Sequence, residues 1–559
     1  MLTAPEDNFV KMYERSFREH WDLEAITDYG TTNTLTYGQL AANIWRLQRL
    51  FHHCGVKQGD RIALMGKNNC NWVTVYLATV TYGVVIVPIL QDFKAEDALH
   101  IINHSGSKML FITDLIFEGM TLEQMEEMRV VYSLTNFKVL ATNISEKKDV
   151  SWEWAGKEFD KKFPKGMKPD DVKYKECSNA NIASINYTSG TTGFSKGVMT
   201  TCNALASHIK FFFSTGKVYP GCRHVAFLPL AHAYGCAVDF LGCLAAGGHT
   251  YFIGRTPAPK ILIQAFKEVK PTLILSVPLI LEKIYKQQIA PQIAKPPVSW
   301  VLKLPFLEDI VLDKIRQQLV EVFGGEFYQI IIGGAPLNKE VEDFLYRIKF
   351  PLSVGYGMTE CAPLIAWSMW PDGKPGSCGK VLEGYMEAKI VRPNEEGIGE
   401  VLVRGENVMK GYYRNEQATK EAFTKDGWLK TGDLGMIDED GYLYIKGRNK
   451  TMLLGPSGQN IYPEEIESKL NNLPYVSESI VLQYDDHLVA LVYPDYTAAD
   501  LNKLSQEDLV AAIEEDRQML NKQLAAYEQV VKIKLYPHEF EKTPKRHIKR
   551  FLYTQMAWE

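Results

Sequence analysis

The sequence contains no apolar run long enough to cross a membrane. A spanning helix needs about 18 or more consecutive apolar residues. The longest apolar stretches, residues 84–90 and 228–253, are broken by Pro88 or by His232, Asp239 and glycines. The N-terminal sequence also lacks the apolar core of a secretory signal. These patterns predict buried strands and core helices in a cytoplasmic chain, and they leave peripheral contact with the inner membrane surface open.

Cysteine is scarce as well, and neither sign of charge is in large excess. The nine cysteines include no C-x-x-C pair and no zinc-finger spacing with histidine, which excludes the zinc-finger classes. So few cysteines in 559 residues predict reduced, mostly buried thiols. A formal net charge of −5 supplies no overall basic field, so nucleic acid is not an expected partner.

The composition and patterning that are present predict a multidomain α/β protein. A chain of 559 residues exceeds the roughly 100–200 residues of one domain. Short apolar strands alternate with amphipathic helices, and after about residue 380 the chain becomes rich in turns and then α+β. We expect a large multi-subdomain N-terminal body over residues 1–447, with α/β sheets and a small β-barrel-like part, and a small mobile α+β C-terminal lid over residues 448–559.

Helical periodicity is clearest at two places in the body. Phe9, Met12, Tyr13 and Phe17 predict a helix that docks on the body; a membrane-surface anchor is the alternative, disfavoured by acidic residues in the segment. Farther along, we expect a second helix, followed by a strand over 272–277 and then by a helix that begins at Pro278. The apolar face of that second helix has i, i+3, i+4, i+7 spacing: Leu262, Ala265, Phe266 and Val269.

The later part of the chain predicts a hairpin and a compact α+β unit. Strands over 388–391 and 400–403 flank a turn-rich segment. The expected elements of the unit are a helix opened by Pro463, strands 480–484 and 488–493 joined at Asp485-Asp486, a helix from Ser505, and a strand over 531–535.

The strongest chemical signal is the segment Tyr187-Thr-Ser-Gly-Thr-Thr-Gly-Phe-Ser-Lys-Gly197, which follows a short apolar strand. Its glycines and hydroxyl residues supply backbone and side-chain donors that can surround phosphate oxygens, and Lys196 adds a cation. It is not a Walker loop, because the lysine precedes its glycine. The alternative interpretation, a solvated loop rich in serine, threonine and glycine, is disfavoured by eleven residues of this composition.

This segment resembles the phosphate loop of the AMP-forming superfamily of acyl-CoA synthetases, luciferases and peptide-synthetase adenylation domains. The likeness runs from about Leu35 to the C-terminus, and residues 270–285 and 538–544 are similar to the long-chain fatty-acid branch. Further motifs follow in the order of the family: residues 227–235, 333–337, 355–360, 374–379, 428–433, 447–448 and 462–465.

The resemblance implies a role for each matched residue. Tyr356 is expected to stack on adenine, Thr359 to bond the α-phosphate, and Asp433 to accept the ribose hydroxyls. Thr188 and Glu360 are expected to hold Mg²⁺, with Lys196 countering phosphate charge. The full set implied to bind ATP or AMP is Thr188, Ser189, Gly190, Thr191, Thr192, Gly193, Lys196, Gly334, Ala335, Pro336, Gly355, Tyr356, Gly357, Met358, Thr359, Glu360, Asp433 and Arg448.

The remaining implied roles concern the acyl chain and domain motion. His232, Tyr234 and Gly235 are expected to line the acyl pocket, and Lys450 falls at the hinge position of the family. The implied reaction has two steps: a fatty acid and ATP form acyl-AMP and pyrophosphate, and the lid then rotates so that coenzyme A takes the acyl group. Without the family, each residue has an ordinary structural interpretation, such as a helix cap at Thr359-Glu360 or a core position for His232.

One segment departs from the pattern of the family. The family places a catalytic lysine near the C-terminus, and an ungapped alignment of Thr543-Pro544 and Arg550 puts His547 at that position. Three interpretations stay open: Lys545 or Lys549 supplies the charge, His547 acts as an imidazolium, or adenylation is impaired. We hypothesise that the basic cluster, and not His547 alone, supports adenylation.

The alternatives for function differ in the thiol acceptor or in the chemistry. An acyl-acyl-carrier-protein ligase shares the first step with an acyl-CoA synthetase. A non-catalytic protein that binds nucleotide or acyl chains is the third alternative, and His547 is its support. The sequence leaves acyl chain length and oligomeric state open.

Overall fold

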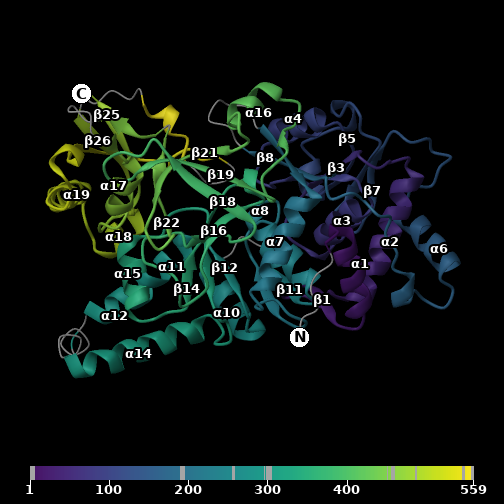
Figure 1. The fold of residues 1–559 in the computed structure, drawn as a ribbon, viewed down its shortest axis with the longest axis horizontal. Helices are drawn as coiled ribbons and strands as arrows, with labels where there is room; N and C mark the ends of the chain where they lie inside the picture. The colour runs from purple at the N-terminus through teal and green to yellow at the C-terminus, as the bar shows by residue number, and fades with distance from the viewer. Residues whose placement is uncertain are drawn as a thin grey trace.

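The computed structural model describes residues 7–188, 196–254, 258–294, 296, 305–449, 451–454, 460–484, 487–543 and 548–554. The molecule is elongated, and the C-terminal elements, drawn in yellow, lie at one end of the long axis in Figure 1. The N-terminal helices α1, α2 and α6 lie toward the opposite end. The predicted mixed α/β class, with a large and a small part, is confirmed.

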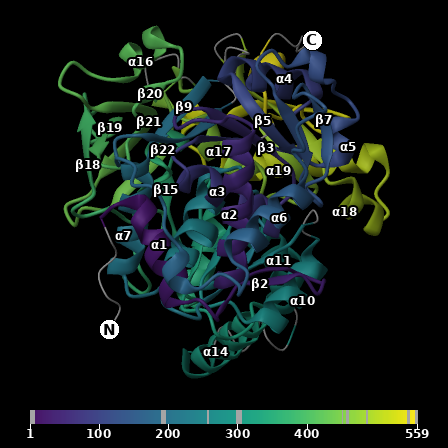
Figure 2. The same ribbon diagram turned by 90° about the vertical axis from the view of Figure 1, so that its right-hand side faces the viewer.

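A mixed eight-stranded sheet forms the first layer of the body. Its inner strands β8, β4, β3, β5 and β6 run parallel, and the outer strands β20, β9 and β7 pair antiparallel. In spatial order the strands are β20 (Gly411–Tyr412), β9 (Lys196–Thr201), β8 (Ile182–Thr188), β4 (Val85–Ile89), β3 (Arg61–Met65), β5 (Ser107–Ile112), β6 (Val130–Ser133) and β7 (Val139–Thr142). Helices α2 (Tyr37–His53), α3 (Cys70–Thr81), α4 (Ala95–Ser105) and α6 (Trp152–Lys162) belong to this region, and Figure 2 shows α2, α3 and α6 near the viewer.

The predicted N-terminal helix, α1 (Phe9–Glu19), docks on this body. Asn8 caps it through bonds to the Val10 and Lys11 amides. The four predicted apolar residues are buried, and the Tyr13 hydroxyl donates to the Leu241 carbonyl at 3.0 Å. The docking prediction is therefore confirmed, because the apolar face of α1 is covered by protein.

A second sheet combines two strands from the start of the body with two from its middle. Its order is β10 (Arg223–Ala226), β11 (His249–Phe252), β1 (Glu24–Asp28) and β2 (Thr34–Thr36). Between β10 and β11 the chain forms α8 (Ala233–Gly235), the π-helix η3 (Cys236–Gly242) and α9 (Cys243–Ala245). η3 packs on α7 (Cys202–Ser214) and on β10.

A third, parallel sheet holds β12 (Ile274–Ser276), β13 (Ile330–Ile332) and β14 (Leu352–Val354). The predicted apolar face of α10 (Pro259–Val269) is buried, and Pro278 begins α11 (Pro278–Ile284), as expected. β12 is shorter than the predicted strand, and the helix continues as a π-helix, η4 (Tyr285–Ile289). The region also contains α12 (Ala290–Ala294), α14 (Pro305–Val322) and α15 (Lys339–Arg347).

Antiparallel strands follow the parallel sheet. β15 (Tyr356–Gly357), β16 (Leu364–Trp367) and β17 (Lys380–Val381) form a small sheet. A four-stranded sheet of β18 (Met386–Val391), β19 (Gly399–Gly405), β21 (Leu429–Ile437) and β22 (Leu443–Arg448) occupies the region of the expected β-barrel-like part. The predicted hairpin is confirmed by the antiparallel register of β18 and β19.

The C-terminal unit has hydrophobic clusters made of its own residues. Its predicted elements are confirmed, with Pro463 at the first helical position and Ser505 as a helix cap; Asp485-Asp486 lies outside the described residues. The unit contains β23 (Leu453–Leu454), β24 (Asn460–Ile461), α17 (Pro463–Leu470), β25 (Val476–Tyr484), β26 (His487–Pro494), α18 (Tyr496–Leu501), α19 (Gln506–Asn521) and β27 (Val530–Leu535).

Among the described residues, several contacts join this unit to the body, including a salt bridge between Lys446 and Glu465. Tyr462 packs with Ile398 and Leu434, and Lys286 donates to the Asn471 carbonyl at 2.7 Å. Within the described part of the chain, no helix is long and apolar enough to cross a membrane.

Candidate functional site

Two of the predicted nucleotide segments lie at one edge of the parallel sheet. The segment 333–336 follows β13, and the segment 355–360 follows β14, so both leave the carboxyl ends of neighbouring parallel strands. The Gly355 amide donates to the Ile332 carbonyl at 2.8 Å and fixes their relative position. Ligands of open α/β sheets bind at such edges. The predicted adenine wall, residues 334–336, is exposed there.

Tyr234 packs against the first of these segments from the segment expected to line the acyl pocket. Its hydroxyl donates to the Ile331 carbonyl at 2.9 Å. A Cβ atom on Gly333 would approach the Tyr234 Cζ atom to 3.0 Å, so glycine permits this close packing. Gly334 has a φ of +88°, which favours glycine. His232 precedes α8 and is half-buried, and Gly235 is buried.

A buried carboxylate connects the second segment to the antiparallel sheet. The Tyr356 hydroxyl donates to Asp433 Oδ2 at 2.5 Å, and Arg448 Nε lies 2.9 Å from Asp433 Oδ1. Strand pairing places Arg448 there, because β21 and β22 pair with Asp433 opposite Arg448. Asp433 is only 4% exposed, whereas the Arg448 side chain is 59% exposed. The three residues expected around adenine and ribose therefore meet.

Burial and hydrogen-bonded or charged partners shift the pKa of Asp433 in opposite directions. Burial raises the pKa of the Asp433 carboxyl, and the Arg448 charge and the Tyr356 hydroxyl offset only part of that rise. Burial also raises the pKa of Tyr356 well above its usual value, so the phenol stays a proton donor. Since a carboxylate oxygen has two lone pairs, each Asp433 oxygen can accept one further hydrogen bond.

The residues expected around phosphate and Mg²⁺ lie near one another, and Glu360 is close enough to Asp433 for its charge to raise the pKa of that carboxyl. Thr188 and Lys196 are opposite each other in the β8–β9 pair, and the Thr188 hydroxyl donates to the Lys196 carbonyl at 3.4 Å. β9 contacts the short helix η5 (Thr359–Cys361), which carries Glu360. One hydroxyl and one carboxylate suit a hard cation that keeps water and phosphate as its other ligands.

Tyr412 joins these groups, and the sequence analysis did not identify it. Its hydroxyl donates to Glu360 Oε1 at 2.9 Å, and Lys196 Nζ lies 5.0 Å from the centre of its ring. β20 holds Tyr412 in place by pairing with β9, opposite Val198. The Met409 amide also donates to the Glu360 carbonyl at 2.7 Å. A tyrosine outside any motif gives no chemical signal in a sequence, so only the strand pairing reveals it.

Several predicted residues cannot be placed. The loop residues 189–193, the hinge candidate Lys450, and Lys545 and His547 lie outside the described residues. Lys549 lies just before the short helix η7 (Arg550–Leu552), and its Nζ contacts Glu541 Oε1 at 2.6 Å. The Lys549 amide donates to the Glu541 carbonyl at 2.8 Å. Lys549 is therefore held by Glu541 in this arrangement.

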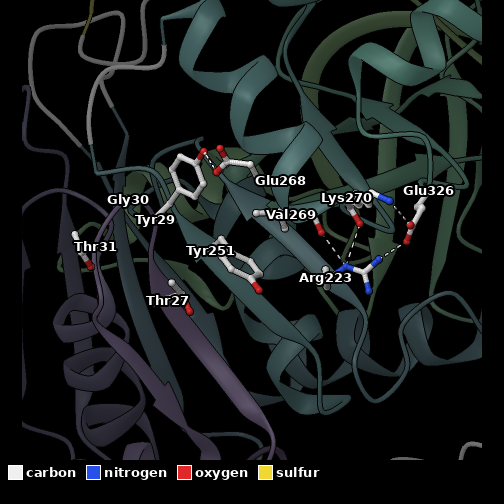
Figure 3. Close-up of a pocket in the computed structure, with 10 residues that line it drawn as sticks. All are labelled: Thr27, Tyr29, Gly30, Thr31, Arg223, Tyr251, Glu268, Val269, Lys270 and Glu326. Atoms are coloured by element: carbon white, nitrogen blue, oxygen red, sulfur yellow. Dashed lines mark hydrogen bonds and ion pairs between the residues drawn. The ribbon is translucent and has the colours of Figure 1, made fainter.

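A surface pocket of about 560 Å³ lies elsewhere, between the second sheet and the end of α10 (Figure 3). Its charges pair with each other: Arg223 and Lys270 contact Glu326, and Tyr29 donates to Glu268 at 2.6 Å. None of the site residues expected from the sequence lines it. This pocket is therefore separate from the candidate site.

Comparison with known proteins finds similar long-chain-fatty-acid–CoA ligases and solved structures with the same fold. The chain is 29% identical to the long-chain-fatty-acid–CoA ligase FadD15 of Mycobacterium bovis, over 97% of this chain and 94% of that protein. It is 28% identical to the rat long-chain-fatty-acid–CoA ligase ACSBG2, over 80% of this chain and 71% of that protein. ATP-bound MatB from Rhodopseudomonas palustris has the same fold, with a TM-score of 0.75, 23% identity, and 98% of each chain covered.

The match to a protein family covers most of the body. Residues 13–413 match the family described as AMP-binding enzyme. That range includes Thr188, Lys196 and Glu360 and the newly identified Tyr412, while Asp433 and Arg448 follow shortly after it. By this match, which spans well over half of its length, the chain belongs to the AMP-binding enzyme family.

Proposed function

We propose that the chain is an AMP-forming acyl-CoA synthetase for medium- to long-chain fatty acids. In this proposal a fatty acid and ATP give acyl-AMP and pyrophosphate, and coenzyme A then takes the acyl group. The observation that carries the proposal is the buried Asp433 carboxylate between Tyr356 and Arg448, close enough to Glu360 to feel its charge. The names of the curated relatives FadD15 and ACSBG2 support a fatty acid and coenzyme A as substrates.

Asp433 is proposed to hold the ribose. Its carboxylate is fixed by a phenol and a guanidinium, and the remaining lone pairs can accept the two ribose hydroxyls. Hydrogen bonds to a charged group contribute about 1.5–3 kcal/mol each. The exposed wall of residues 334–336 and the Tyr356 ring would then flank the adenine.

Lys196, Thr188 and Glu360 are proposed to act on the phosphates. Thr188 and Glu360 would hold Mg²⁺, which would offset the charge of the phosphate oxygens when it is bound. Lys196 is half-buried beside the Tyr412 ring, so its cation has a fixed position near the end of the phosphate loop. As the carboxylate oxygen attacks the α-phosphorus, pyrophosphate leaves, and a cation placed there stabilises the developing charge.

We also propose the domain boundary at residues 447 and 448, with Lys450 at the hinge. The hydrophobic clusters formed by residues from 453 onward support it, because they contain no residue of the body. Arg448 stands at this boundary and contacts the body carboxylate Asp433 across the β21–β22 pair, before Lys450, so rotation at the hinge would leave that contact in place. Motion of this kind brings different groups to one site in successive steps.

The proposed function predicts which acids and which thiol the protein uses. Pyrophosphate release should be measured with acids of two to eighteen carbons, with and without coenzyme A. We expect release with medium- and long-chain acids, and acyl-CoA as the product, because the relatives share most of the chain. Glu360→Gln serves as the impaired control, and we expect its rate of pyrophosphate release to be lower by about 10²–10³-fold.

Two results would contradict the proposal. A thioester formed only on a carrier protein would exclude coenzyme A as the acceptor. Heat stabilisation by ATP without pyrophosphate release on any acid would make the chain a nucleotide-binding protein without this activity.

The ribose role predicts the effect of Asp433→Asn. Loss of the charge weakens two hydrogen bonds, so we expect the Kd for ATP to rise about 10- to 100-fold. Asp440→Asn is the matched control, because Asp440 lies in the turn between the same strands and is exposed. Calorimetry gives Kd, and circular dichroism checks the fold. Equal ATP affinity in Asp433→Asn and the unaltered chain would exclude the role.

A third set of variants tests the role proposed for the basic cluster in adenylation. Lys545→Ala, His547→Ala and Lys549→Ala should be compared for pyrophosphate release, with Lys503→Ala as an exposed control. We expect a loss of tenfold or more in at least one lysine variant, because a lysine stays charged at neutral pH while an imidazole is partly neutral. Loss confined to His547→Ala would show that the histidine alone supplies the charge.

A further inference from the structure

Two cysteines and a histidine meet in the interior, away from the nucleotide site. Cys222 precedes β10, His224 lies on β10, and Cys243 begins α9; all three are 0% exposed. One ligand atom from each lies within 4.8 Å of the others, and among the described residues no other His, Cys, Asp and Glu side chains form such a group. The separation in sequence explains why zinc-finger spacing is absent.

The strand geometry turns this cluster inward. Successive side chains of a strand point to opposite faces. Arg223 lines the surface pocket of Figure 3, so the next residue, His224, points away from that pocket into the protein. The cluster is therefore enclosed between β10 and the η3–α9 segment, and it is not part of the pocket.

The sulfur positions suit a shared metal ion. Cys222 Sγ and Cys243 Sγ are 4.0 Å apart. Two sulfurs bound to one zinc ion at about 2.3 Å each are about 3.8–4.0 Å apart. A disulfide needs about 2.05 Å. A Cβ atom on Gly248 would lie 2.5 Å from both sulfurs, so only glycine leaves the thiols in this position.

The histidine is oriented as a metal ligand. His224 Nδ1 lies 3.2 Å from Asp239 Oδ1, and Nε2 has no hydrogen-bond partner although the ring is fully buried. Metal-binding imidazoles commonly donate their other nitrogen to a carboxylate, which fixes the tautomer. With the proton on Nδ1, the Nε2 lone pair is available for an ion. Asp239 lies on η3, where its carbonyl accepts the Thr250 hydroxyl at 2.7 Å.

Charge balance selects the kind of cation. Two thiolates in a dry interior carry two negative charges, and an unpaired buried charge is costly. A divalent ion cancels the two thiolate charges, whereas a monovalent ion leaves one of them uncompensated; the Asp239 carboxyl beside the imidazole comes in addition. Thiolate and imidazole ligands favour Zn²⁺ over the hard ions that oxygen ligands hold.

We propose that Cys222, His224 and Cys243 form a buried three-ligand site for a divalent cation of the Zn²⁺ class, bound by both Sγ atoms and His224 Nε2. Asp239 is a positioning residue for the imidazole. The site would tie β10 to the start of α9, on either side of the segment 227–235 that is expected to line the acyl pocket. It would therefore stabilise the body without taking part in the chemistry.

The test uses the full chain with cobalt as the probe, because a buried ion exchanges slowly. The protein is produced in minimal medium with Zn²⁺ or Co²⁺, and bound metal is counted by elemental mass spectrometry. We expect one ion per chain, and a thiolate-to-cobalt charge-transfer band in the cobalt form. Cobalt at the proposed magnesium site has oxygen ligands and gives no such band.

Variants assign the ligands. Cys243→Ser and Cys222→Ser should each remove the band and lower the metal content at least tenfold, and Asp239→Asn should weaken retention against chelator by about 10- to 100-fold. Cys54→Ser is the matched control, since Cys54 is also a buried thiol with a hydroxyl neighbour, Tyr132. His224→Gln gives a second test of the ligand set if a serine variant fails to fold.

Three results would overturn the proposal. The first is a chain that contains no stoichiometric metal and shows no charge-transfer band. The second is a band that persists in both cysteine variants. The third is a disulfide between Cys222 and Cys243 in the protein as purified.

Discussion

The site depends on one buried carboxylate, that of Asp433, which contacts two side chains from different parts of the chain. Asp433 is nearly inaccessible to solvent, and taking its charge out of water is costly. Tyr356, from the end of the parallel sheet, and Arg448, from the paired strand, offset that cost. Because both partners contact it, the carboxylate fixes the antiparallel sheet against the edge where segments 333–336 and 355–360 emerge.

Strand pairing positions the residues that are proposed to act on the phosphates. β9 lies between β8, which brings Thr188 opposite Lys196, and β20, which brings Tyr412 next to both Lys196 and Glu360. Backbone ladders thus set the places of side chains that lie far apart in sequence. The family identification gives this arrangement its chemistry, since the chain is an AMP-binding enzyme by its match over 13–413.

The sequence predicted what local patterns encode. The apolar face of α10, the proline that opens α11, the β18–β19 hairpin and the serine cap of α19 each follow from residues a few positions apart. The bond from Tyr356 to Asp433 and the bridge made by Tyr412 did not follow, because no spacing rule relates residues that meet only through sheet register. The cluster of Cys222, His224 and Cys243 was missed for the same reason, and its cysteines were expected only to be buried thiols. The π-helices also departed from the expected α-helical pattern.

The central claim is that a carboxylate attacks the α-phosphorus of ATP, and the fate of its oxygen atoms tests this most directly. The protein should be given a fatty acid labelled with oxygen-18 in both carboxyl positions, together with ATP, Mg²⁺ and coenzyme A, and the phosphorus products analysed by mass spectrometry. The account predicts one labelled oxygen in each AMP and none in pyrophosphate, because the thiol displaces AMP from the acyl carbon. Label in inorganic phosphate with formation of ADP would contradict it, since the acid would then have attacked the γ-phosphorus.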